Sequence, residues 1–255
     1  MTLYEKIITE YKKIKLITKK FEHQEEREIT TVFFWRPLST IIMIFCQNLT
    51  ISPNAITTLS VVSGIVASIL FLKNNYSLVI AGTILLFISL VIDTIDGQYA
   101  RYKNKTSEFG HWYDGFAEKI RYALIFSSLS VGFYYNNDFT YQFFFQEIDF
   151  LKQHKELILV MGIWCLANLL LVISVQAERT TLSFDYGTLL NIPRKEKRPY
   201  YLSMQVLFYL LLIMFLITNQ IYLLFVFFSL FLPICWLYPF YKLFKNSQTT
   251  NSLIK

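Results

Sequence analysis

The chain alternates long apolar runs with short polar segments, and six of the runs are close to the roughly 20 residues that a helix needs to cross a bilayer. Turn-forming and polar residues mark the ends of the first run, with SPN before it and KNN after it. The six runs fall at 54–72, 76–99, 109–135, 157–176, 200–218 and 221–244. This pattern predicts an all-α integral membrane protein with six transmembrane helices.

The first 35 residues follow a different pattern. Apolar side chains recur there at roughly helical spacing, with lysines between them, at Leu3, Ile7, Ile8, Tyr11 and Ile14. This spacing predicts an amphipathic helix whose apolar face packs either on an anionic leaflet or on the protein itself. A short apolar segment beginning at Arg36 is too short to span, so we place it at the interface. The predicted division is a cytoplasmic amphipathic N-terminal segment, 1–35, and a six-helix membrane domain, 36–255.

Composition and charge agree with a membrane protein and give it an orientation. The chain is 54% hydrophobic and 18% aromatic, which is more apolar than an ordinary soluble domain. All but three of its 24 lysines and arginines lie on one side of the predicted spans, the exceptions being Lys73, Lys152 and Lys155. The positive-inside rule then places both termini in the cytoplasm. Because the net charge of +6 follows the inner membrane face, we do not expect nucleic-acid binding.

Four acidic residues lie at the cytoplasmic ends of the second and third runs. Asp93 and Asp96 are three residues apart, and Asp114 and Glu118 are four apart. On helices each pair shares one face, with Cβ atoms roughly 5–6 Å apart. Four converging negative charges at membrane depth would be costly unless cations neutralised them, which favours a functional site over chance placement. The oxygen ligands favour Mg²⁺ or Mn²⁺, and two such ions are suited to phosphoryl transfer.

Small and basic residues accompany these acids. Gly97 and Ala100 leave room for a ligand close to the backbone, and Arg101 supplies a planar cation that matches phosphate. The spacing D-x2-D-G-x2-A-R-x8-G-x3-D-x3-D is the signature of the CDP-alcohol phosphatidyltransferases, which this chain resembles. Seven of the eight fixed positions agree, at Asp93, Asp96, Gly97, Ala100, Arg101, Gly110 and Asp114. The eighth position holds Glu118 in place of Asp. The stretch ISPNAIT at 51–57 also resembles the family's entry into its first span.

The resemblance implies an enzyme that transfers a substituted phosphate group from a CDP-linked alcohol, often CDP-diacylglycerol, to an acceptor hydroxyl and releases CMP. It implies a role in phospholipid or related phosphodiester biosynthesis, a homodimer, and an active site that faces the cytoplasm. By this resemblance the four acids hold two Mg²⁺ or Mn²⁺ ions, with Asp114 and Arg101 in the catalytic site and Glu118 also the general base. The CDP site is implied at Gly97, Ala100, Arg101, Asn54 and Thr57.

The acceptor site and two other interpretations stay open at this stage. Arg179, at the inner end of the fourth run, is the best basic candidate for a phosphorylated acceptor, and a lipid headgroup is its alternative partner. Because Glu is one methylene longer than Asp, the chain is either an active enzyme with a Glu base or a catalytically degenerate homologue. A membrane metal-ion carrier is a third possibility, since intramembrane acids also bind cations for transport.

Overall fold

The computed structural model describes residues 3–21, 31–73, 75–135, 142–143, 146–147, 154–181 and 204–253, and these residues are almost entirely helical. The chain begins with α1 (Leu3–Phe21), the π-helical turn η1 (Thr31–Trp35) and α2 (Arg36–Cys46). The longer helices are α3 (Pro53–Leu72), α4 (Tyr76–Tyr102), α5 (Glu108–Tyr135), α7 (Glu156–Thr181), α9 (Met204–Ile217) and α10 (Ile221–Leu253). Two short strands, β1 (Gln142–Phe143) and β2 (Gln146–Glu147), pair antiparallel after α5.

Each of the six apolar runs corresponds to one long helix, which confirms the expected all-α fold class. Within the described part of the chain, α3 and α4 are the two helices long and apolar enough to cross a membrane. Shorter apolar stretches occur at Phe33–Cys46, Glu156–Val172 and Ile221–Leu237. Six helices in the predicted places are therefore observed, whereas six membrane spans stay a prediction.

Side-chain caps begin α3 and α5, two of the three helices that meet at the acidic residues. Ser52 precedes α3 and accepts a hydrogen bond from the Ala55 backbone N–H at 3.2 Å, with Pro53 in the first turn. Ser107 does the same for α5, because its hydroxyl accepts from the Gly110 N–H at 3.0 Å. These caps fix where the first turns of α3 and α5 begin, and both turns border the site described below.

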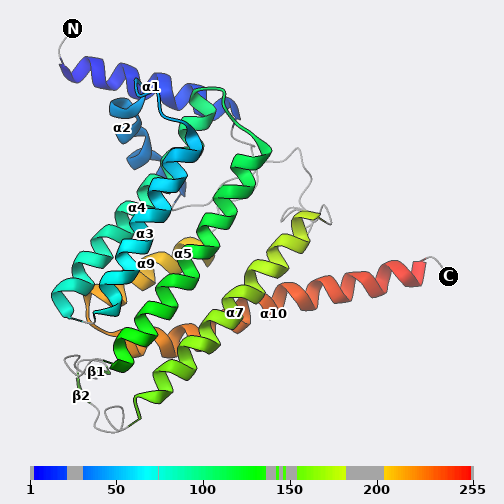
Figure 1. Cartoon of the computed structure of the whole chain (residues 1–255). Helices are drawn as coiled ribbons and strands as arrows, with labels where there is room; N and C mark the ends of the chain where they lie inside the picture. The colour runs from blue at the N-terminus through cyan, green and yellow to red at the C-terminus, as the bar shows by residue number, and fades with distance from the viewer. Residues whose placement is uncertain are drawn as a thin grey trace.

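The helices α3, α4 and α5 pack together and form the part of the bundle that carries the site. Helix α3 packs against both α4 and α5, while α7 packs against α5 and α10 (Figure 1). Small residues permit these close approaches: a Cβ added to Gly132 of α5 would overlap the Phe71 carbonyl oxygen of α3. The other face of α3 is apolar and open, since Leu59 and Ile69 are each more than half exposed. Such a continuous exposed apolar face is typical of a helix that meets lipid.

The N-terminal helix α1 lies across one end of this bundle, where α4 ends (Figure 1). It contacts α2 and α4, and Ile14 on its apolar side is fully buried. Packing on the protein, one of the two partners expected for this amphipathic helix, is therefore observed. Leu16 of the same helix is 64% exposed, so part of α1 still presents an apolar side chain outward.

Candidate active site

Three carboxylates converge where α4 and α5 meet the first turn of α3. Asp93 and Asp96 come from the C-terminal half of α4, and Asp114 comes from the first third of α5. One oxygen of each lies within 4.8 Å of the others. Asp96 is buried, while Asp93 and Asp114 are half-buried. The helical spacing of the first pair and the packing of both helices on α3 create this cluster.

Each of the two carboxylates on α4 is held by a side chain from another helix. The Thr57 hydroxyl of α3 donates a hydrogen bond of 2.5 Å to Asp96 Oδ2. The guanidinium of Arg121 on α5 donates to Asp93 Oδ1 at 2.9 Å, which makes an ion pair between a buried arginine and a half-buried aspartate. These contacts fix the orientation of both acids without using all of their oxygens. Each of the two bonds uses one oxygen of its carboxylate, so the other oxygen can face a cation.

A cavity of about 240 Å³ opens beside the three acids. Its lining residues come from the start of α3, the end of α4, the connection to α5 and the first turns of α5. They are Pro53, Asn54, Thr57, Asp96, Gly97, Ala100, Arg101, Lys105, Thr106, Ser107, Gly110, His111 and Asp114. The Arg101 side chain lies over Gly97, where a Cβ would come within 3.3 Å of Nη1. Acidic groups, a guanidinium and open backbone thus border the same space.

The residues present fit a hard divalent cation. All three ligand groups are carboxylates, and Mg²⁺ and Mn²⁺ prefer oxygen donors. The spacing of the oxygens, within 4.8 Å, allows them to share one ion or to flank two. The cavity beside them carries Arg101 and Lys105, which suit the phosphates of a ligand bound through such ions.

The sequence profile of the CDP-alcohol phosphatidyltransferases matches residues 50–235, which is most of the chain. The chain belongs to this family. Searched against curated proteins, it has no detectable match. Family membership makes the protein a transferase that acts on a CDP-linked alcohol, and the acid cluster agrees with the family's use of divalent metals. Family membership and the apolar helices together also indicate that the chain is a membrane protein.

All five residues expected at the CDP site of this family member line the cavity. They are Asn54, Thr57, Gly97, Ala100 and Arg101. Thr57 also contacts Asp96 directly, so it connects the cavity to the acid cluster. The five residues named from the sequence therefore lie around one cavity in the structure, and their roles in binding CDP remain a proposal.

Two of the expected site residues, Glu118 and Arg179, are not among the side chains that meet at the acid cluster or the cavity in the described part of the chain. Glu118 is on α5 one turn beyond Asp114, is half-buried, and accepts a hydrogen bond of 3.4 Å from the Tyr122 hydroxyl. It is not one of the three acids whose oxygens converge among the described residues. Arg179 lies in α7, but its side chain falls outside the described residues. Both assignments stay predictions.

The structure adds Lys105 to the cavity, a residue that the sequence pattern did not single out. Asn104, at φ +53°, ends α4 in the left-handed conformation. Its N–H and that of Lys105 donate to the carbonyls of Arg101 and Ala100, at 3.2 and 2.8 Å, which is a Schellman cap. The cap holds Lys105 beside Arg101. An Asn three residues after the motif Arg is the sequence signal that indicates this turn.

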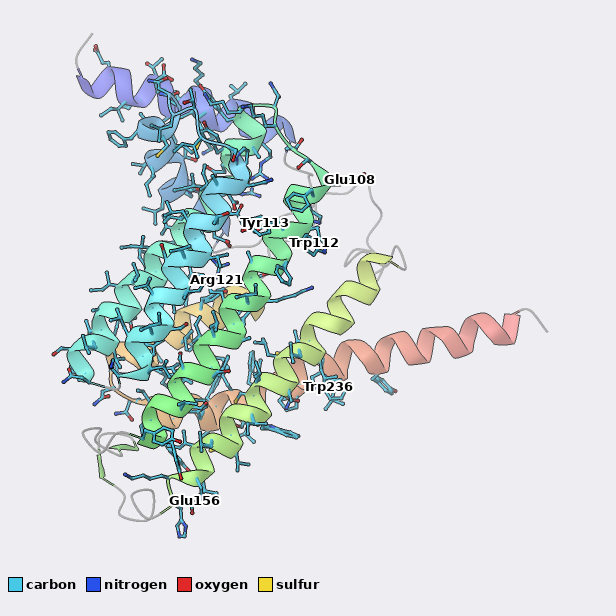
Figure 2. All side chains as sticks on the ribbon, viewed as in Figure 1. Glu108, Trp112, Tyr113, Arg121, Glu156 and Trp236 are labelled. Atoms are coloured by element: carbon cyan, nitrogen blue, oxygen red, sulfur yellow. The ribbon has the colours of Figure 1, made fainter. Side chains whose placement is uncertain are left out.

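Arg121 is the second residue that sequence reasoning missed. The positive-inside pattern assigns its charge to the inner membrane face, but the side chain is buried within the bundle. Figure 2 shows it midway along α5, pointing from that helix toward α3, well below Trp112 and Tyr113. The only sequence signal was an arginine inside an apolar run, one turn after Glu118.

Proposed function

We propose that this protein transfers a substituted phosphate group from a CDP-linked alcohol, such as CDP-diacylglycerol, to the hydroxyl of an acceptor alcohol, and releases CMP. The observation that carries the proposal is the convergence of Asp93, Asp96 and Asp114 at one side of a cavity that also contains Arg101. Metal ligands and phosphate-binding cations in one place are what this chemistry requires.

In the proposed reaction the acceptor oxygen attacks the phosphorus that bears the donor's alcohol. The bond from this phosphorus to the bridging oxygen of CDP breaks, and CMP leaves with that bonding pair. Asp93, Asp96 and Asp114, with Glu118, would hold two Mg²⁺ or Mn²⁺ ions. When bound, such ions stabilise the attacking and leaving oxygens. Arg101 orients the diphosphate, and Gly97 and Ala100 let the nucleotide approach the α4 backbone.

Glu118 takes the proton of the acceptor hydroxyl in this proposal. It is half-buried and one turn from Asp114, so a rotation of its longer side chain would carry the carboxylate toward the acid cluster. The nearby Tyr122 hydroxyl donates to Glu118 Oε1 and restrains it.

In this proposal the protein is a homodimeric membrane enzyme with six spans, and both its termini and its active site face the cytoplasm. Arg179 is the proposed contact for a phosphorylated acceptor.

The test is release of CMP by the purified protein with Mg²⁺ or Mn²⁺, CDP-diacylglycerol and a panel of acceptors. We expect turnover by the wild type, a loss of roughly 100-fold or more in Glu118→Gln, and retained activity in Glu118→Asp. Turnover only in Glu118→Asp would identify a degenerate homologue. Calorimetry of CDP binding with and without Mn²⁺ separates the transferase from a metal-ion carrier, because the transferase should bind CDP in the presence of Mn²⁺ whereas a carrier has no site for the nucleotide.

A further inference from the structure

The ion pair between the buried Arg121 and the half-buried Asp93 connects the acid cluster to the core of the bundle. Arg121 is only 1% exposed and is the largest of the fully buried side chains among the described residues. Asp93 is one of the three converging carboxylates. A fully buried arginine is rare unless it is paired, and here its partner is a motif acid.

The surroundings of Arg121 are shaped for it. Its Nη1 donates to the Ser60 hydroxyl at 2.5 Å and to the Ser89 hydroxyl at 3.3 Å, while Nη2 donates to Asp93. Ser60 and Ser89 in turn donate to each other's backbone carbonyls, at 2.9 and 2.7 Å. Gly64 leaves space for the side chain, since a Cβ there would lie 3.1 Å from Arg121 Cγ. Three helices thus contribute to one arginine site.

We propose that Arg121 is an internal counter-cation and positioning residue for the acid cluster. It neutralises part of the cluster's negative charge when no metal is bound, and it holds Asp93 Oδ1 so that Asp93 offers Oδ2 to a metal ion. The inference rests on the proposed divalent-metal site and adds a residue that the family's acid motif does not contain. The folded protein then does not depend on metal to keep its acids together.

Two effects of Arg121 on metal binding oppose each other. Holding Asp93 in one orientation favours binding, because a fixed ligand loses less rotamer freedom. The positive charge disfavours binding, because a guanidinium repels a divalent cation bound to the same carboxylate. With charges a few ångströms apart in a protein interior, the repulsion exceeds the cost of fixing one side chain. Removing the charge is therefore expected to tighten metal binding and to make stability depend on metal.

The experiment compares the full-length wild type with Arg121→Met and Arg121→Lys in detergent. Mn²⁺ affinity is measured by electron paramagnetic resonance, and thermal unfolding is followed in EDTA and in saturating Mn²⁺. We expect Arg121→Met to bind Mn²⁺ at least about tenfold more tightly. We also expect it to unfold at a lower temperature in EDTA and to regain most of that loss in Mn²⁺. Arg121→Lys, which keeps the charge, should stay close to the wild type in Mn²⁺ affinity.

Asn168→Ala is the matched control for a purely structural role. Asn168, on α7, is also buried and accepts a 2.9 Å hydrogen bond from Trp236 of α10. Figure 2 shows Trp236 near the crossing of α7 and α10, away from Arg121 and Tyr113. Loss of the Asn168 side chain should lower the unfolding temperature equally in EDTA and Mn²⁺. If Arg121→Met behaves like this control and its Mn²⁺ affinity is unchanged or weaker, the proposal is overturned.

A double variant, Asp93→Asn with Arg121→Met, covers the case in which Arg121→Met does not fold. Recovery of folded protein by the double variant in EDTA supports the proposal, because the unpaired Asp93 charge was then the cause. Failure of both variants to fold overturns it in favour of packing by the arginine stem. Absence of Mn²⁺ binding by the wild type would refute the metal site of the proposed function, and the EDTA comparison would still decide whether the ion pair stabilises the fold.

Discussion

The hydrogen bond from Thr57 to Asp96 gives the sharpest test of how α3 supports the acid cluster. Thr57→Val keeps the shape of the side chain and removes only the hydroxyl. Asp96 is 5% exposed and receives this bond at 2.5 Å. A hydrogen bond to a charged group contributes about 1.5–3 kcal/mol, and the buried carboxylate has little water to replace it. For a chain of this size the loss corresponds to a fall of roughly 3–12 °C in unfolding temperature.

Thr58 supplies the matched control for this measurement. Its hydroxyl contacts the Tyr113 hydroxyl at 3.0 Å, but this contact is exposed and involves no acidic residue. Thr58→Val should therefore change stability by only about 0.5 kcal/mol, as exposed substitutions usually do. Thr57→Ser, which retains a hydroxyl, should recover most of the loss.

Thermal unfolding of the purified protein in detergent, in EDTA and again in Mn²⁺, is the assay. The difference between Thr57→Val and the wild type should shrink in Mn²⁺, because a bound ion satisfies the Asp96 oxygen that lost its donor. Equal stability of Thr57→Val and Thr58→Val in EDTA would refute the reasoning, since it would mean that Asp96 does not need its partner on α3.

Two further predictions concern the cavity and the packing around it. Lys105→Met should weaken CDP binding about tenfold while leaving cytidine binding unchanged, because in the proposed site the lost charge would face the diphosphate, which cytidine lacks. Calorimetry checks this, with Lys103→Met as the control, and equal losses for both ligands would be the contrary result. Gly162→Leu should lower the unfolding temperature sharply, because even a Cβ at this position would overlap the Ser130 side chain on α5; unfolding at the wild-type temperature would contradict the observed packing of α7 on α5.

The sequence determined the helices and the local arrangement of the motif. Apolar runs bounded by caps such as Ser52 predicted six helices to within a few residues at most of their ends, because helix formation depends on contacts between residues three and four apart. The same periodicity placed Asp93 and Asp96 on one face of α4. The motif spacing also indicated several of the residues that border the cavity, because these lie within the short stretch from the end of α4 to the start of α5, although it missed Lys105.

The tertiary structure decided which distant side chains meet. Thr57 and Asp96 are 39 residues apart, and Asp93 and Arg121 are 28 apart, so no local periodicity relates them. Their contacts depend on how α4 and α5 are rotated and shifted against α3, which the packing of the whole bundle sets. The same packing buried Ile14 of α1 against the protein and turned Arg121 from an apparent charge of the membrane face into the internal partner of Asp93.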